Sequence, residues 1–437
     1  MPSPPGGRGA RIAAEMARHL ITNVRILDGT GREPFAGAVR VDGNRIAEVA
    51  AGPVQARPDD RVIDGRGATL MPGLIEPHAH LSFADITSHE MTRLPPEEHL
   101  LATLRNARTM LDAGYTSALS AAAAKPRLDV VVKREVEAGR FPGPRLLANG
   151  PEITVTGGLG DSNLLHLPHH ETPTFCWVAD GPDAIRRVCR LLAREGVDLL
   201  KLNLSGDLGT SAWSSELTPM SEAEVAAAME VARARDIRVC AHCRSGDSVR
   251  MAVKHGIEVI YHANYCDEAA LDALESARDR VFVAPALGIT YNLSQANGQW
   301  GVTPERVVEF ERELAASVET IARMRRRGIR VLPGGDYGFV YTPHGTYARD
   351  LWLFVKLLGY SPMETLVAAT LLGGEIMGLP GELGVLTPGA LADLLLVDGD
   401  PLADIAILQD RGAIRMIMKD GALHKAPPDI PGRSTRA

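Results

Sequence analysis

The chain of 437 residues is 45% hydrophobic and 23% charged, and its formal net charge is -7. This length exceeds one ordinary domain and suits an α/β barrel of roughly 250–350 residues with an accessory domain. The acidic balance is spread without long runs of one sign, which argues against nucleic acid or an anionic membrane as the main partner. We expect a small-molecule substrate and a homo-oligomer.

The ends and the cysteines bear on where the protein works. Residues 1–15 are rich in Pro, Gly and Arg and lack the apolar core of a secretory signal. We therefore predict disordered tails at 1–17 and 426–437. Five cysteines cannot all pair, and most lie in apolar stretches, so a reducing, cytoplasmic setting is expected. The sequence has no run of about 18 apolar residues, so we expect no membrane-spanning segment.

Two strand-rich segments flank a long central region. In 18–70, short alternating runs such as Leu20–Leu27 and Gly37–Val41 are separated by Gly, Asp and Pro. In 380–425, similar runs lie at Leu394–Val397 and Ile414–Lys419. Neither segment is large enough for its own core. The two ends are therefore predicted to build one small β-sandwich domain together.

Between them, in 71–379, apolar strand patterns alternate with helical patterns, which is typical of a parallel α/β sheet. The expected strands are Thr69–Ile75, a strand from Thr116, Arg145–Asn149, Asp198–Leu202, Arg238–His242, Glu258–His262, Val281–Pro285 and Arg330–Pro333. The expected helices are Glu97–Asp112, Leu128–Ala138, Asp183–Glu195, Glu222–Ala234, Ser248–His255, Glu268–Ala277, Pro304–Arg327, Arg349–Leu358 and Met363–Met377. Eight strands favour a closed (β/α)₈ TIM barrel. No GxGxxG motif follows the first strand to support a dinucleotide fold.

The sharpest chemical signal is His78-Ala79-His80, at the end of the apolar run Leu70–Ile75. Residues i and i+2 of an extended chain point the same way, so the two imidazoles can hold one ion. The alternative is a pair of surface histidines in a loop.

Further residues of metal-ligand type stand at other strand ends. Lys201 lies in an apolar strand, where its charge is costly unless it is removed or paired. A less basic amine could take up carbon dioxide and form a carbamate that bridges two cations, whereas a lysine that reaches solvent is the alternative. His242 and His262 end the fifth and sixth strands, and Asp336 follows the eighth. Four strand ends with such residues favour a metal site.

These motifs resemble the amidohydrolase superfamily. Met71–His80 is similar to its opening signature, and the segments around His242, His262 and Asp336 resemble its ligands on strands 5, 6 and 8. The resemblance runs from about Leu20 to Asp420. Leu200-Lys201-Leu202 followed by Ser205-Gly206 resembles the branch of Xaa-Pro dipeptidases, ochratoxin-type amidases and herbicide-degrading hydrolases, in which this lysine is carboxylated.

The resemblance implies a binuclear metal centre. His78, His80 and Asp336 would hold the buried ion, His242 and His262 the second, and a carbamate on Lys201 would bridge them. Two zinc ions are expected, with cobalt or manganese as alternatives. Activated water would then cleave a C–N bond of an amide, carbamate or urea in a small, largely apolar substrate. Asp336 would act as general base and acid.

Some positions depart from the family pattern. Glu76 replaces the usual Asp, and Tyr261 stands where Glu is common, which should alter geometry more than chemistry. Leu159 stands where dipeptidase relatives often carry His, which weakens a dipeptide substrate. Substrate contacts are expected at Leu159, His344, Tyr265 and at His166 in the histidine-rich loop 165–170.

Other readings stay open at this point. A mononuclear site would leave Lys201 unmodified. A dipeptidase, or a hydrolase of lactones, esters or phosphotriesters, could use the same site, because fold does not fix substrate. The departures at Glu76 and Tyr261 leave room for a non-catalytic binding barrel.

Overall fold

A computed structural model describes residues 18–167, 174–209 and 211–427. The predicted tail 1–17, and residues 428–437 of the second tail, lie outside these residues. Contacts divide the described chain into two compact units. One comprises 18–75, 111–116 and 362–427, and the other comprises 76–110 and 117–361 within the described ranges. The predicted barrel extended to residue 379, whereas 362–379 group with the first unit.

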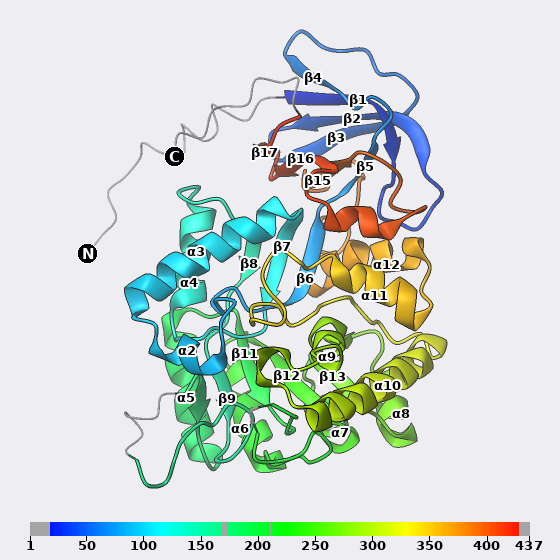
Figure 1. Cartoon of the computed structure of the whole chain (residues 1–437). Helices are drawn as coiled ribbons and strands as arrows, with labels where there is room; N and C mark the ends of the chain where they lie inside the picture. Colours follow the sequence, from blue (N-terminus) through cyan, green and yellow to red (C-terminus); the bar gives the residue numbers. More distant parts are fainter. Residues whose placement is uncertain (1–17, 168–173, 210, 428–437) are drawn as a thin grey trace, which may run out of the picture. The chain divides into compact units, whose positions relative to one another are not determined.

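The first unit contains an eight-stranded sheet in which strands from both chain ends lie side by side (Figure 1). Its order is β17-β16-β15-β5-β1-β2-β3, with β4 paired to β1. The bounds are β1 Arg18–Ile26, β2 Phe35–Asp42, β3 Arg45–Ala51, β4 Asp60–Asp64, β5 Thr69–Pro72, β15 Leu394–Val397, β16 Ile414–Lys419 and β17 Ala422–Lys425. Hydrogen bonds join these strands into one sheet.

The core of this unit shows why both ends are needed. Val39 and Leu70 from the N-terminal strands pack in one buried cluster with Leu394 and Met416 from the C-terminal strands. The unit also holds α12 Pro362–Ala369, α13 Leu371–Ile376 and the short helix η2 Ile405–Gln409. The single helix expected over Met363–Met377 is therefore wrong. Thr370, at φ -122° and ψ -76°, is not helical and separates the two segments.

Parallel strands form the centre of the second unit. One sheet has the order β6-β7-β8, and the other β10-β9-β11-β12-β13-β14. The bounds are β6 Leu74–Ala79, β7 Tyr115–Ser120, β8 Arg145–Leu147, β9 Glu152–Thr154, β10 Cys176–Val178, β11 Leu199–Asn203, β12 Arg238–Ser245, β13 Val259–Tyr265 and β14 Phe282–Ala284.

Single contacts connect these two sheets into a ring. The amides of Asp198 and Leu199 donate to the carbonyl of Ala148, just after β8. Parallel bridges join Val283 to Val331 and Tyr337 to Ala79, which leads back to β6. The eighth strand expected at Arg330–Pro333 is thus a bridge and not a regular strand. Pro333 has no N–H to donate, and two glycines follow it.

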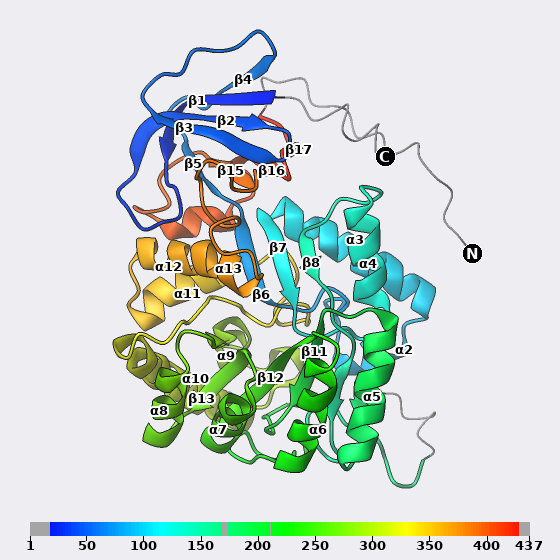
Figure 2. The same cartoon turned by 180° about the vertical axis from the view of Figure 1, so that it is seen from behind.

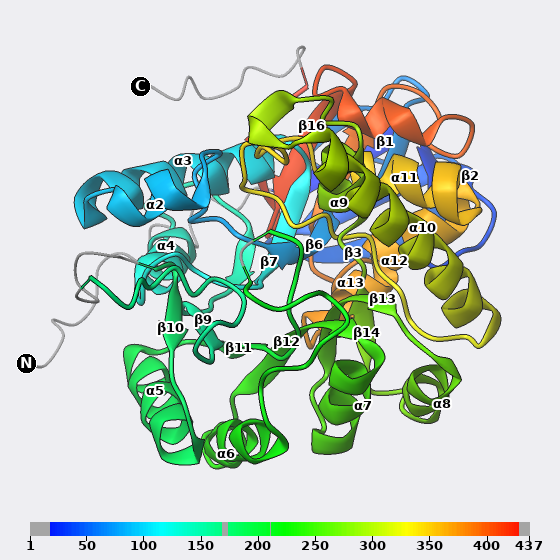
Figure 3. The same ribbon diagram turned by 60° about the horizontal axis from the view of Figure 1, so that its bottom comes forward.

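Helices flank these strands, and α5 to α8 lie on the outer side of β11 to β13 (Figures 2 and 3). The short helix η1 covers Gln299–Gly301. Sequence reasoning missed β9, β10, α2 and α9. The bounds are α2 Ser88–Arg93, α3 Pro96–Asp112, α4 Leu128–Glu137, α5 Pro182–Glu195, α6 Glu222–Arg233, α7 Gly246–His255, α8 Glu268–Ser276, α9 Leu287–Ser294, α10 Pro304–Arg326 and α11 Arg349–Leu358.

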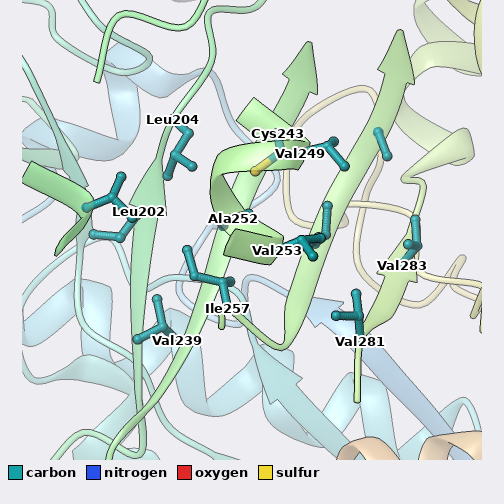
Figure 4. Close-up of a cluster of buried hydrophobic side chains, with 14 of the residues drawn as sticks. Leu202, Leu204, Val239, Cys243, Val249, Ala252, Val253, Ile257, Val281 and Val283 are labelled. Atoms are coloured by element: carbon teal, nitrogen blue, oxygen red, sulfur yellow. The ribbon is translucent and has the colours of Figure 1, made fainter. Parts of the chain in front are cut away.

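Local chemistry and packing explain how these helices are fixed. Ser221 and Glu224 form a capping box at the start of α6, which satisfies two backbone N–H groups there. Helix α7 buries Val249 and Val253 against strand residues such as Val239 (Figure 4). This packing holds the strands, and therefore their ends, in fixed positions.

Two further observations concern the whole described chain. All five cysteines are buried free thiols. No described helix has both the length and the apolar composition that crossing a membrane requires.

Candidate metal centre

The first two candidate ligands come from β6 and the residue after it. His78 and His80 lie two positions apart on the extended chain and are 0% and 2% exposed. The Nδ1 atom of His80 lies 3.1 Å from the carbonyl oxygen of Ala122, so it carries the proton. Its other ring nitrogen, Nε2, lies 3.0 Å from Oδ1 of Asp336.

Three more candidates come from neighbouring strands. Lys201 lies in the middle of β11, and His242 lies on β12 opposite Asn203. His262 lies on β13, where one extra residue relative to β12 shifts the register. Its φ of 73° is in the left-handed region, which is unusual for a residue with a side chain. Such bulges redirect side chains beside functional sites.

Asp336 follows the irregular segment that takes the place of an eighth strand, and its own φ is 60°. Its backbone carbonyl accepts a hydrogen bond of 2.9 Å from Thr342 Oγ1, which fixes this turn. The preceding residue must be glycine, because a Cβ at Gly335 would lie 2.1 Å from Asp350 Oδ2. The chain can therefore pass close to its neighbours and still present the Asp336 carboxylate to the histidines.

The donor set fits a metal ion. His78, His80 and Asp336 offer ligand atoms that lie within 4.8 Å of one another. Both ring nitrogens of His78, Nδ1 of His262 and Oδ1 of Asp336 are buried, and none has a hydrogen-bond partner among the residues that the structure describes. Buried polar atoms are rarely left unpaired. A neutral His78 ring carries its proton on one nitrogen only, so the other nitrogen, together with His262 and Asp336, can offer lone pairs that a divalent cation would satisfy.

The electrostatics keep these groups in the form that binds metal. Burial lowers the pKa of His78, His242 and His262 well below the usual range, so their imidazoles are neutral. Burial opposes ionisation of Asp336, but the His78 and His80 side chains and the Lys201 amine that face it together hold its pKa below the usual range. Nε2 of His242 donates to the Gly206 carbonyl at 3.1 Å, so Nδ1 is the nitrogen whose lone pair could bind a metal ion.

The two departures from the family pattern have clear structural roles. The Tyr261 ring stacks on His78 with a centroid separation of 3.8 Å, and its hydroxyl donates to the Pro77 carbonyl at 3.0 Å. Glu76 accepts the backbone N–H of His78 at 2.9 Å, and burial raises its pKa well above the usual range. Both residues position His78.

One small cavity of about 70 Å³ is lined by all six predicted ligands. Much of its remaining wall is apolar. Of the four predicted substrate contacts, Leu159 belongs to this wall. The apolar lining residues are Leu159, Phe175, Leu208, Ile289, Leu293, Phe310, Phe339 and Tyr341.

The other predicted substrate contacts lie elsewhere and do not line the cavity. His166 is exposed, and residues 168–170 of its loop lie outside the described residues. Tyr265 is half-buried at the end of β13. His344 is buried, with Nε2 2.7 Å from the Phe83 carbonyl and Nδ1 2.7 Å from the Tyr347 hydroxyl.

Sequence reasoning missed four charged residues of the cavity wall. Glu152 from β9 places Oε1 3.6 Å from the Lys201 ammonium. Arg244 from β12 pairs with Glu313 from α10 at 2.5 Å, and Asp207 lies in the loop after β11. Arg244 could have been found, because it stands two residues after His242 on one strand face. Nothing local predicts Glu313, which comes from a distant helix.

Comparison with known proteins decides the family. The model of the amidohydrolase family matches residues 69–423. The chain belongs to the amidohydrolase family. It is 26% identical to ochratoxinase of Aspergillus niger over 384 residues, covering 83% of this chain and 77% of that protein. It is 26% identical to imidazolonepropionase of Ralstonia nicotianae over 431 residues, covering 92% of this chain and 96% of that protein.

A solved relative confirms the architecture. The structure of a prolidase complexed with N-methylphosphonate-L-proline matches with a TM-score of 0.83 and 28% identity, covering 94% of this chain and all of that chain. The expected family, the α/β barrel with an additional β domain, and the enzyme class of a C–N bond hydrolase are thereby confirmed. The roles of individual site residues stay predictions.

Proposed function

We propose that this amidohydrolase holds two divalent metal ions and cleaves the C–N bond of a small amide, carbamate or urea with a largely apolar body. One observation carries the proposal. Six buried side chains of metal-ligand type line one cavity, and four of their nitrogen and oxygen atoms have no hydrogen-bond partner among the described residues. A non-catalytic barrel would not be expected to keep buried acceptors unpaired, because each one costs stability.

The residues divide into two groups around the cavity. His78, His80 and Asp336 would hold one ion, and His242 and His262 the other. Lys201 would bridge the two as a carbamate. Zinc suits this set of imidazole and carboxylate ligands, and cobalt or manganese would also fit. When bound, the ions would supply Lewis-acid polarisation of the scissile carbonyl and a lowered pKa for water.

The chain's own groups perform the proton transfers. The ionised Asp336 would accept a proton from the attacking water and return it to the leaving nitrogen, as a general base and then a general acid. The apolar wall around Leu159 and Phe339 would exclude bulk water and bind the apolar body of the substrate. The hydrogen bond from His80 to Ala122 would hold one ligand ring in place during this cycle.

Metal analysis of the purified protein tests this proposal. We expect about two equivalents of transition metal, activity lost on chelation, and activity regained with zinc, cobalt or manganese. His78→Ala should lose metal and turnover. His89→Ala, an exposed histidine on α2, is the matched control and should keep both. Well under one equivalent of metal, with no activity regained, would refute the proposal.

A substrate panel then separates the remaining readings. Anilides, N-acyl amino acids, carbamates, phenylureas and lactones should be compared at equal enzyme and metal concentration. Faster cleavage of a lactone than of any amide, carbamate or urea would show that the chain cleaves a C–O bond instead of a C–N bond. Full activity with one tightly bound ion would favour the mononuclear site. The homo-oligomer and the cytoplasmic location also stay predictions.

A further inference from the structure

Lys125 is a lysine outside the metal centre, in the segment that follows β7, and its side chain is only partly exposed. Among the described residues, no carboxylate oxygen lies within ion-pair distance of its amine. Two other lysines show the common arrangement, since Lys133 pairs with Asp198 at 2.7 Å and Lys254 pairs with Glu222 at 2.5 Å. A partly buried ammonium without a carboxylate gives up its proton more easily than a paired one.

The amine of Lys125 contacts an imidazole instead. Its Nζ lies 2.7 Å from Nδ1 of His99, a fully buried residue of α3, and 3.4 Å from the carbonyl oxygen of Met91. Two positive charges at the shorter of these distances would repel strongly, so at least one of the two side chains is neutral. The pair therefore holds an amine beside a ring nitrogen that can accept its proton.

The other ring nitrogen fixes His99 in this accepting role. Nε2 lies 2.5 Å from the carbonyl oxygen of Ser82, so Nε2 carries the proton and the lone pair of Nδ1 faces Lys125. On the same helix, Asn106 Nδ2 donates to the backbone carbonyls on either side of Ser82, at 2.9 and 3.1 Å. Lys125, His99 and the Ser82 carbonyl thus follow the order of nucleophile, base and orienting group.

Burial favours the neutral form of both groups. It lowers the pKa of Lys125 below the usual range. It also lowers the pKa of His99, against the hydrogen bond to Ser82 and in the same direction as the charge of Lys125. A larger share of the Lys125 amine is therefore neutral near pH 7 than is the case for an exposed lysine, and only the neutral amine is a nucleophile.

We propose that Lys125 is an acylation site, at which its amine accepts the acyl group of an activated donor such as an acyl phosphate while His99 takes the proton. The neutral amine attacks the carbonyl carbon, and a C–N bond forms. The C–O bond to phosphate breaks, and phosphate leaves with the electron pair. The proton of the amine passes to Nδ1 of His99 and from there to water. Neither residue lines the metal cavity, so this reaction is separate from the proposed hydrolysis.

Trace labelling of all lysines in one sample tests this inference. The purified protein is treated with a small amount of isotopically labelled acetyl phosphate over a range of pH. It is then denatured and fully acetylated with an unlabelled reagent, and mass spectrometry of its peptides gives the acetylation rate of each lysine. Lys133 is the matched control, because it is also partly buried but has a carboxylate partner, and Lys254 is the exposed control. The same labelling is repeated on His99→Gln.

In wild type at pH 7, Lys125 should be acetylated at least about 10-fold faster than Lys133, and also faster than the more exposed Lys254. Its rate should reach half of the maximum at a lower pH than the rate of Lys254, because burial lowers its pKa. Gln at position 99 keeps a carbonyl for Lys125 and an N–H for Ser82, but it is not a base. His99→Gln should therefore slow Lys125 by about 10-fold or more and leave Lys254 unchanged.

Two results would overturn the inference. One is a Lys125 rate no higher than that of Lys133 in wild type, since that pattern marks the histidine contact as structural only. The other is an unchanged Lys125 rate in a His99→Gln variant whose circular dichroism shows that it is folded. If this variant fails to fold, the wild-type comparison with Lys133 decides by itself. Neither measurement depends on metal content or on hydrolysis, so the inference and the proposed function can fail separately.

Discussion

Replacing Glu152 with Gln reports the chemical state of Lys201. Nζ of Lys201 lies 3.6 Å from Glu152 Oε1 and 4.6 Å from the centre of the Tyr261 ring. Lys201 and Glu152 are both almost fully buried. The second carboxylate oxygen of Glu152 accepts a hydrogen bond of 2.7 Å from Asn203 Nδ2. Glu152 is therefore placed to act as the counter-ion of Lys201 whenever this amine is charged, and nothing in the local sequence indicates this partner.

The size of the effect follows from this geometry. At an effective dielectric of about 20, opposite charges 3.6 Å apart attract with roughly 4 to 5 kcal/mol. Removing one partner of a buried pair costs on the order of 3–5 kcal/mol, because the other charge stays buried. Gln has nearly the volume of Glu, so packing is kept. If metal binding converts Lys201 to a carbamate, the two groups repel, and the same substitution should cost nothing or stabilise.

The assay compares unfolding free energies in denaturant for wild type and Glu152→Gln. Each is measured metal-free without carbon dioxide, and metal-loaded with labelled bicarbonate, whose carbamate signal is followed by NMR. Glu309→Gln removes an exposed, ion-paired carboxylate on α10 and serves as the control. We expect a loss of about 3 kcal/mol in the metal-free state only. The same loss in both states, with no labelled carbamate, would refute the bridging carbamate on Lys201.

Three further predictions concern activity and pH. Lys201→Ala should lower both metal affinity and turnover by more than the roughly 10- to 100-fold that loss of a supporting residue costs, and added acetate or propionate should restore part of both; full metal content with normal turnover would contradict it. Asp336→Asn should lower kcat by roughly 10²- to 10⁴-fold without changing the circular dichroism, and near-normal kcat would remove Asp336 as general base. Burial raises the pKa of Asp129 to about 7, against the opposing hydrogen bond from Ser120. The folded state then holds this proton more tightly than the unfolded state, so stability of the metal-free protein should fall as pH rises from about 4 to 7, and Asp129→Asn should flatten that slope in pH-dependent melting.

Strand periodicity and position at the predicted strands were sufficient to single out the six metal-ligand candidates, whose roles stay predictions. His78 and His80 share a face because a strand repeats every two residues, and parallel strands bring their ends to one edge of the barrel. The same reasoning placed Lys201 and His242 on neighbouring strands, where the structure pairs Lys201 with Cys240 and Asn203 with His242. These inferences needed only the local pattern and the order of elements.

The charged partners required knowledge of the fold. Glu152 lies on a three-residue strand that is too short for a periodic signal. Glu313 meets Arg244 across 69 residues of sequence, from the buried side of a long helix whose pattern predicts only the helix itself. His344, whose role in substrate contact stays a prediction, shows a different limit of the local pattern. Its place after the last strand suggested a substrate contact, but its two ring nitrogens are engaged by Phe83 and Tyr347.

The rings of His78, His80 and His242 are oriented by different contacts, and this difference affects how the centre would bind metal. His80 and His242 each direct one ring nitrogen to a backbone carbonyl, so their tautomers are fixed. His78 has no such bond among the described residues, and the Tyr261 ring stacked on it restrains orientation but not the proton. A carboxylate at position 261 could accept a hydrogen bond from a ring N–H of His78 and so fix its tautomer. The Tyr261 ring, which only stacks on His78, cannot do this. Metal binding would therefore select the tautomer of His78, and the buried Glu76 that accepts its backbone N–H would hold the strand in place while it does.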